Sequence, residues 1–429
     1  MRSSNYSPAG ERGLFRRDRR LFLNSGTWTW TIPDGVTKVW AFCMGAGGGG
    51  PTYGTANTNN FGVLGGGKGG GYASGVISGL TPGGTLTLTI GEGGLGSYRG
   101  ATAGNGGNTT VALTGGSTYL TGNGGGGGSN TPVTSDNGSQ KGQGGSASTS
   151  GVTDAYTAAG GGSGNYPAGV GYSGITTSNI STVTGGGASG SPFGTGMGGG
   201  KSVAAQKSPT GGGGWTQEDY RHPHAVQSSS GETMMEGGYF CGYGSHEYPA
   251  PFAKSATAWF GTGGKGGKGL TAQGGLSLSL NNWFASYLGA DLVGSRIVDI
   301  QKELLDGENG NPDWWFPWEI DGGGGGSVYH TNSAGSWTVT GGQGGPGAGG
   351  GGAGGYGSNN CISRAGRGGF GGGGGGARVS ATTINYWIYS VGGDGGNGGG
   401  GGGAWGRIES SKYMPVGGNG GDGAVGLYW

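Results

Sequence analysis

One stretch of the chain contains most of the side chains that could bind a metal ion. His222 and His224 lie two residues apart in a His-Pro-His segment, and Cys241, His246 and Glu247 follow. Imidazole nitrogens and thiolates are common ligands of zinc and related transition metals. A polar surface loop has the same composition, and we favour that interpretation. We therefore expect no cofactor.

Carboxylates in the same stretch could form the paired acids of a glycoside hydrolase. The candidates are Glu218, Asp219, Glu232 and Glu236. Any acidic loop looks the same, no Ser/His/Asp arrangement accompanies them, and the 4 histidines of the whole chain leave little for general acid–base catalysis. We expect that the protein is not an enzyme, and we keep a polysaccharide-degrading spike as an alternative.

Two glycine motifs also suggest ligand chemistry. Gly200-Lys201-Ser202 ends like a phosphate-binding loop, but Thr195 stands where that motif needs its first glycine. Residues 417–422 read GGNGGD and resemble one turn of a calcium-binding β-roll, which needs several consecutive repeats. In a chain this rich in glycine, single matches of this kind are expected by chance.

Aromatic side chains give the strongest signal for binding. Aromatic rings supply large, rigid contact surfaces at small entropic cost, and they suit sugar stacking and protein interfaces. The alternative is that the rings fill the scaffold, which has few aliphatic residues. The candidate contacts with a receptor or partner are Trp215, Tyr220, Tyr239, Tyr243, Tyr248, Trp314, Trp315 and Trp318.

Composition indicates an ordered but unusual protein. Of 429 residues 123 are glycine, 10% are charged and 10% are aromatic. Disordered chains are typically rich in charge and poor in aromatics, and flexible linkers do not contain many tryptophans. We therefore expect large aromatic side chains to fill the gaps that glycine backbones leave.

The charge and cysteine content suggest the setting of the protein. A net charge of +1 predicts no general attraction to nucleic acid or to anionic membranes. Three scattered cysteines favour assembly in a reducing cytoplasm over a disulfide framework. Residues 1–24 form a basic arm that we expect to attach the chain to other proteins, through Arg16, Arg17, Arg19 and Arg20. A disordered tail is the alternative interpretation of this segment.

Short strands separated by glycine runs are the expected elements. Alternation of apolar and polar residues predicts strands near 28–32 and 85–90, and 39–44 is apolar on both faces. Pro33-Asp34-Gly35 makes a hairpin between 28–32 and 39–44 the simplest interpretation. Further strands are predicted at 111–113 and 117–120 as a second hairpin, at 276–280, within 377–391 and at 425–429.

The glycine runs have a period of three. Residues 263–268, 392–397 and 417–422 consist of Gly-Gly-X triplets. A period of three matches an extended left-handed helix with three residues per turn, in which glycine permits close approach. We expect a mainly β, glycine-rich scaffold with packed helices of the polyglycine-II type. The alternative is that the glycine runs are flexible loops, since ordering glycine costs much chain entropy.

One segment departs from this pattern. Residues 281–305 place apolar side chains three or four positions apart, which predicts an α-helix. We expect one glycine-rich β domain over 25–429, with insertions at about 129–158, 215–260 and 281–320.

The two ends of this predicted domain resemble a known family. Ser25-Gly26-Thr27-Trp28-Thr29 leading to Ile32-Pro33-Asp34-Gly35-Val36 is similar to the opening of glycine-rich domains in bacteriophage tail proteins, and Gly420–Trp429 resembles their last strand. Related adhesins at fibre tips are known for sandwiches of packed polyglycine helices that display receptor-binding loops. This chain departs from them in lacking a large separate N-terminal attachment domain.

The resemblance implies a structural protein of the virion, made in the host cytoplasm. Its implied role is a tail fibre, tail tip or spike that contacts a host glycan or outer-membrane protein, together with other virion proteins and as a homo-oligomer, with a trimer favoured. One alternative is a head fibre or capsid decoration protein. Another is an ice-binding glycine-rich protein, which needs a flat, regular Thr/Ala face that the long insertions argue against.

Overall fold

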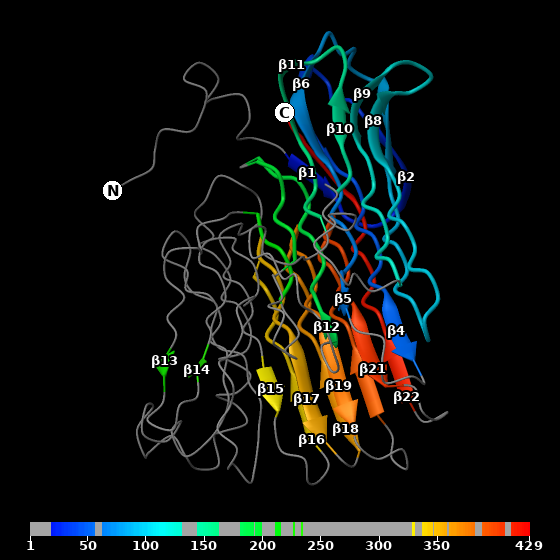
Figure 1. Cartoon of the computed structure of the whole chain (residues 1–429). Helices are drawn as coiled ribbons and strands as arrows, with labels where there is room; N and C mark the ends of the chain where they lie inside the picture. The colour runs from blue at the N-terminus through cyan, green and yellow to red at the C-terminus, as the bar shows by residue number, and fades with distance from the viewer. Residues whose placement is uncertain are drawn as a thin grey trace, which may run out of the picture.

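The computed structural model shows a β protein with two differently built ends. It describes residues 19–55, 62–130, 144–162, 181–192, 194–199, 211–215, 226–227, 233–234, 328–330, 337–345, 347–357, 360–381, 388–407 and 413–429. Antiparallel sheets form one end and parallel sheets the other, and glycine tracts run between them (Figure 1). No part of this described chain is α-helical.

Two antiparallel sheets of five strands make the first end, which we call the sandwich. One sheet has the order β1 (Arg19–Phe22), β23 (Ala424–Tyr428), β3 (Lys38–Met44), β6 (Tyr72–Ser78) and β11 (Thr153–Ala158). The other has the order β10 (Ala147–Thr149), β9 (Thr118–Gly122), β8 (Thr109–Leu113), β7 (Thr85–Ile90) and β2 (Gly26–Thr31). The edge strands β10 and β11 come from the region that the sequence assigned to an insertion at 129–158.

The core of the sandwich lies between the inward faces of these sheets. Leu86, Leu88 and Ile90 of β7 are buried, while the threonines between them are partly exposed, as period-2 alternation requires. They pack in one cluster with Trp30, Val39 and Leu427, against which Trp429 also lies. The prediction that the strands near 28–32, 39–44, 85–90 and 425–429 share one core is confirmed.

The pairing of these strands differs in one place from the prediction. The hairpin between 28–32 and 39–44 is wrong, because β2 pairs with β7 and β3 pairs with β6 and β23. The turn at Pro33–Gly35 takes the chain from one sheet to the other, so that Trp30 and Val39 face the same core from opposite sides. The second predicted hairpin is confirmed as β8 and β9, which pair antiparallel.

The other end of the molecule consists of parallel strands in stacked sheets. One sheet has the order β15 (Val328–His330), β17 (Ala353–Gly357), β19 (Ala377–Ala381), β21 (Ala404–Arg407) and β4 (Thr52–Thr55). The second has the order β16 (Trp337–Thr340), β18 (Cys361–Arg364), β20 (Ile388–Val391) and β22 (Tyr413–Val416). The hydroxyls of Ser363 and Ser390 donate to backbone oxygens of Ala353 and Trp405, at 2.7 and 3.0 Å, and thereby join the sheets.

Two further pairs complete the described strands. β5 (Gly62–Leu64) pairs in parallel with β12 (Ser181–Val183), and β13 (Val226–Gln227) pairs antiparallel with β14 (Thr233–Met234). The stretch predicted within 377–391 contributes two strands, β19 and β20, to different sheets. The predicted strand 276–280, the triplets at 263–268 and the predicted helix 281–305 lie outside the described residues.

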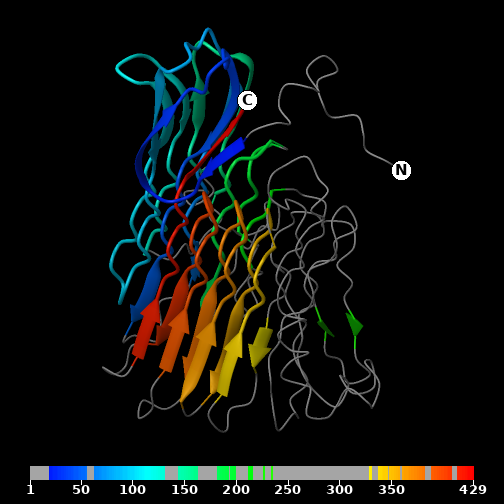
Figure 2. The same ribbon diagram turned by 180° about the vertical axis from the view of Figure 1, so that it is seen from behind.

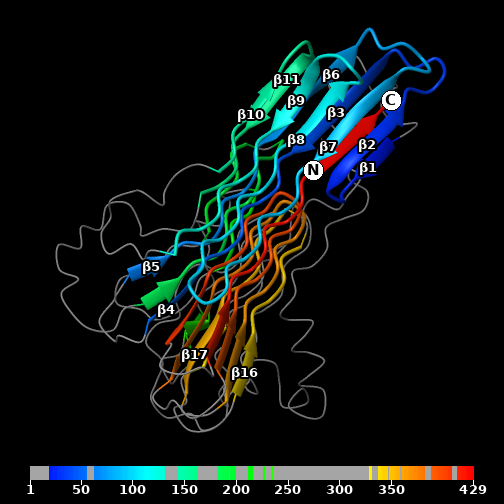
Figure 3. The ribbon, with the colours of Figure 1, turned by 90° about the vertical axis from the view of Figure 1, so that its right-hand side faces the viewer.

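Glycine tracts bridge the two ends, and they are hydrogen-bonded to one another in three directions. The N–H groups of Gly47, Gly48 and Gly49 donate to backbone oxygens of three different tracts, at Gly421, Lys68 and Gly104. The N–H of Gly50 then returns to the first of these tracts, at Gly418. This tract is therefore ordered and bonded to neighbours in three directions, so the tracts form a bundle instead of a flat sheet (Figures 2 and 3).

Close approach of the backbones explains why these positions are glycine. A Cβ atom on Gly48 would lie closer than 3.0 Å to backbone atoms of Gly126 and Gly127. No rotamer change relieves such a clash, since the Cβ position is fixed by the backbone. At positions that face another backbone in this way, the tracts can pack at this spacing only without side chains.

A 13-residue motif builds the tracts near the parallel strands. Residues 341–353 read GGQGGPGAGGGGA, 365–377 read AGRGGFGGGGGGA, and 392–404 read GGDGGNGGGGGGA. In each, the tract leaves a strand of the second parallel sheet, turns at a glycine with φ near +80° (Gly347, Gly371 or Gly398) and returns to a strand of the first. Left-handed φ values favour glycine, so the turn has the same residue each time.

Candidate interaction surfaces

One face of the tract region displays side chains at every third residue. Its tracts are neighbours in the order 341–345, 365–370, 392–397, 417–422 and 91–98, because the N–H groups of Gly344, Gly368, Gly395 and Gly420 each donate to the next tract. We call this the tract face. Its outward side chains include Gln343, Arg367, Asp394, Asn419, Glu92, Leu95 and Tyr98.

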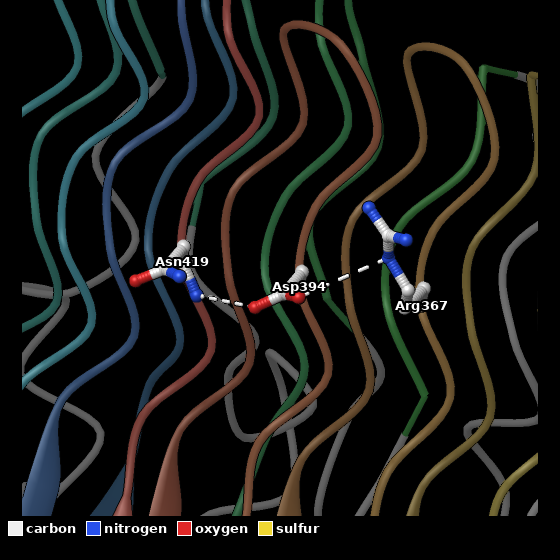
Figure 4. Close-up of polar contacts among 3 residues, drawn as sticks. All are labelled: Arg367, Asp394 and Asn419. Atoms are coloured by element: carbon white, nitrogen blue, oxygen red, sulfur yellow. Dashed lines mark hydrogen bonds and ion pairs between the residues drawn. The ribbon is translucent and has the colours of Figure 1, made fainter.

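Three of these polar residues form a ladder across neighbouring tracts (Figure 4). The Arg367 Nε lies 3.8 Å from the Asp394 Oδ2, and the side chains are 65% and 43% exposed. The backbone N–H of Asn419 donates to the Asp394 Oδ1 at 2.8 Å, and that of Gly96 donates to the Asn419 Oδ1 at 2.9 Å. Asp394 and Asn419 therefore accept hydrogen bonds from backbone N–H groups at the surface of the bundle.

Asp422 ties the tracts to the sandwich in the same way. Its Oδ1 accepts from the N–H of Gly93 at 2.8 Å, and its Oδ2 accepts from the N–H of Ser25 at 3.1 Å. Asn397 donates from its Nδ2 to the backbone oxygen of Leu23 at 2.9 Å. Both oxygens of the carboxylate in the calcium-like motif thus have a structural role. In the described part of the chain, no three metal-binding side chains cluster.

The most exposed large apolar side chains of the tract face lie in its last tract. Leu95 is 68% exposed and Tyr98 is 45% exposed. The Cζ of Arg99 lies 5.2 Å from the centre of the Tyr98 ring, and Arg99 has a φ of 48° in a turn closed by the N–H of Ala101 and the oxygen of Tyr98. This turn offers a mixed aromatic and cationic surface.

A second surface is the outer face of the sandwich sheet that contains β7. Antiparallel register brings Thr27 of β2, Thr89 of β7 and Thr110 of β8 into one row, which continues to Thr121 and Ser148. We call this surface the threonine face. Its outward residues are Thr27, Thr29, Thr31, Thr85, Thr87, Thr89, Thr110, Ala112, Thr118, Thr121 and Ser148.

Of the predicted contact residues, the structure describes only Trp215. It is 2% exposed, its Nε1 donates to the Ser189 hydroxyl at 2.9 Å, and its ring meets that of Phe370 at 90°. This position corrects the prediction of a surface contact, because the ring fills a gap among glycine tracts. The other predicted contacts, Tyr220, Tyr239, Tyr243, Tyr248, Trp314, Trp315 and Trp318, lie outside the described residues, as do His222 and His224.

The basic arm is described only from Arg19. Arg19 pairs with Tyr428 in the β1–β23 ladder, and the Cζ of the exposed Arg20 lies 5.4 Å from the centre of the Phe22 ring. Arg16 and Arg17 lie outside the described residues. An exposed cationic residue in the edge strand β1 is consistent with protection of that edge as well as with attachment.

Two buried titratable groups are held in their neutral forms. Burial raises the pKa of the Cys43 thiol from 9.0 to about 12, and it also raises the pKa of Tyr72. Both side chains lie in the hydrophobic clusters of the sandwich. They act as packing residues, since neither anion forms near neutral pH.

Sequence reasoning missed both surfaces. The signal for the tract face was the identity of X in the Gly-Gly-X triplets, which is polar in 392–397 and 417–422. The signal for the threonine face was alternation, in GTWTWT and TLTLTI. Neither pattern predicts which strands or tracts are neighbours, and both surfaces depend on the hydrogen-bonded pairing of neighbours in the structure.

No helix in the described part of the chain is long and apolar enough to span a membrane.

Comparison with known proteins identifies the family. No curated protein matches the sequence. The model of a glycine-rich domain family matches residues 23–276, which is more than half of the 429 residues. The chain therefore belongs to this glycine-rich domain family.

Proposed function

We propose that the protein is a structural component of a bacteriophage virion, in a tail fibre, tail tip or spike that contacts the host surface. The observation behind this proposal is the two-ended architecture (Figure 1). The first and last described strands, β1 and β23, pair in the sandwich, while strands β17 to β22 lie at the opposite end. One end then joins the particle, and the other end, which consists of the parallel strands, is directed toward the host.

The glycine tracts are the rigid spacer in this proposal, and we infer that they are helices of the polyglycine-II type. Their support is the return of the hydrogen-bond partner after three residues, from Gly47 to Gly50, with a different neighbour for each residue between. Each tract is bonded on several sides, so bending one tract breaks bonds to several others. A spacer of this kind transmits position without the flexibility of glycine linkers.

The remaining expectations belong to the same proposal. The partners are other virion proteins, reached through the basic arm, and a host glycan or outer-membrane protein. Further copies of the chain, most simply in a trimer, complete the assembly. Light scattering of the purified protein tests the oligomer, and a monomer at all concentrations would contradict it.

Immunogold electron microscopy tests the location. Antibodies against the purified chain are applied to intact particles of the phage from which the chain is taken. Gold at the tail tip or fibres supports the proposal, whereas gold on the head favours the alternative of a head fibre or capsid decoration. Absence of the chain from purified particles would refute a virion role.

A polysaccharide-degrading spike is tested separately. Purified protein is incubated with host capsular or cell-wall polysaccharide, and new reducing ends are measured. We expect none. Release of reducing ends that is lost on replacing Glu218 or Glu232 by Gln would make the protein an enzyme.

A further inference from the structure

The threonine face is a two-dimensional array of nearly identical side chains. Neighbouring antiparallel strands lie about 4.8 Å apart, and alternate residues along a strand lie roughly 6.8 Å apart. Thr29, Thr87, Ala112 and Thr118 form one row, parallel to the row from Thr27 to Ser148. Thr31 and Thr85 begin a third row. Across β2, β7 and β8 the side chains thus repeat at regular intervals in both directions, whereas a register shift between Val111 and Ala112 interrupts the spacing toward β9.

The array is held rigidly from behind and within. Behind it, Leu86, Leu88 and Val111 are fully buried in the sandwich core. Threonine is β-branched, so its side chain has few χ1 states to lose on binding. The hydroxyls of Thr87 and Thr114 are hydrogen-bonded at 2.9 Å, which restricts the Thr87 side chain further.

The chemistry of the face excludes most partners. Protein interfaces depend on tryptophan, tyrosine and arginine anchors, and sugar sites use aromatic platforms. Phosphates and nucleic acids require positive charge. The outward residues of this face are threonines with one serine and one alanine, and none is aromatic or charged. The distinguishing property that remains is regular repetition, which is matched by a partner that is itself neutral and periodic.

We propose that the threonine face binds ice. A surface of ice is uncharged, so it complements a face without charges. Its water molecules repeat at intervals close to those of an antiparallel sheet. Threonine methyl groups order the adjacent water, and the hydroxyls hold it by hydrogen bonds, so that this layer can join the crystal. Because strands twist by about 20–25° relative to one another, the flat contact centres on β2, β7 and β8. This inference is independent of the proposed role in a virion.

The test uses the purified full-length chain. Thermal hysteresis and the shape of single ice crystals are measured for the unchanged protein and for Thr87→Tyr, which puts a bulky ring in the middle of the array. Tyrosine is a good strand former, so the sheet is expected to persist. Thr29→Tyr makes the same change on β2, where the side chain is exposed. Thr102→Tyr is the matched control, because Thr102 is exposed and lies outside the sandwich strands. Melting curves confirm that each variant is folded.

We expect thermal hysteresis and faceted crystals from the unchanged protein and from Thr102→Tyr, and loss of both from Thr87→Tyr and Thr29→Tyr. Absence of hysteresis in the unchanged protein would overturn the proposal, as would full hysteresis in folded Thr87→Tyr. Crystalline cellulose and chitin are assayed in parallel by sedimentation. Binding to either that Thr87→Tyr abolishes, without hysteresis, would assign the face to a crystalline polysaccharide and refute ice.

Discussion

A pair of glycine-to-alanine variants tests the packing of the tracts. Gly48 and Gly126 lie in tracts that touch one another, and both receive the same added methyl group. On Gly48 the new Cβ would lie closer than 3.0 Å to the backbone of Gly126 and Gly127. On Gly126 its nearest atoms would be the Lys68 Cδ at 3.7 Å and the Asn105 Oδ1 at 4.0 Å, which are ordinary contacts. The two substitutions therefore differ only in their surroundings.

The expected effects have opposite signs. Forcing a methyl group into a packed interior costs about 1–3 kcal/mol, and each backbone hydrogen bond that is lost costs about 0.5–1.5 kcal/mol more. The N–H of Gly48 donates to Lys68 at 2.9 Å, and this bond lengthens if the tracts separate. Gly48→Ala should thus destabilise by about 2–4 kcal/mol. Gly126→Ala should be neutral or stabilising by up to about 1 kcal/mol, because alanine reduces the entropy of the unfolded chain.

Thermal unfolding followed by calorimetry compares the two variants with the unchanged protein. Both should be folded at room temperature, with the midpoint lowered only in Gly48→Ala. Equal midpoints would refute the packing argument, since they would mean that the tracts separate without cost. A large loss in Gly126→Ala would show that glycine is needed there for a reason other than close approach.

Four further substitutions, one of them combined with a change of pH, test individual contacts. Trp215→Ala should lower the free energy of unfolding, measured with urea, by about 3–5 kcal/mol, because removal of the buried ring leaves a large cavity. A loss below about 1 kcal/mol would contradict the burial of Trp215. Asp422→Ala should destabilise the fold by about 1–3 kcal/mol, because the N–H groups of Gly93 and Ser25 lose their acceptor. Arg367→Ala should destabilise it by less than about 1 kcal/mol, because the ion pair of Arg367 with Asp394 is exposed. Equal losses would contradict this ranking. For Cys43 the folded-state pKa is raised, so its contribution to stability is complete below pH 9.0 and is lost as the pH rises toward about 12. Melting midpoints should fall over that range, and less steeply in Cys43→Ala; identical slopes would contradict the assignment.

Local sequence patterns were sufficient for most of the individual strands. Alternation located β2 and β7, and the run from Val39 to Met44 located a strand buried on both faces. These predictions succeeded because the burial of a strand's side chains determines which of its own residues are apolar. The hairpin at 28–44 failed because a turn signal shows where the chain reverses but not which sheet receives the next strand.

The burial of a single side chain outside the strands was the hardest feature to predict. Trp215 was placed among surface contacts because it precedes a stretch rich in aromatic residues. Its burial depends on a gap beside Gly371, where even a Cβ atom would clash with the indole ring. That gap is made by the 13-residue motif, some 150 positions further along the chain. No local property of residues near 215 reports it.

By itself the sequence determined the composition of the scaffold, the period of three in its glycine runs and the period of two in its strands, because backbone geometry imposes these periods on each segment separately. Only the tertiary structure decided which tracts and strands are neighbours. Long-range hydrogen bonds between glycine backbones, such as that from Gly47 to Gly421, make those choices. Glycine has no side chain that could encode a preferred partner, so the order of the tracts comes from the strands and turns at their ends. The ladder from Arg367 to Asn419 and the rows of the threonine face follow from that order.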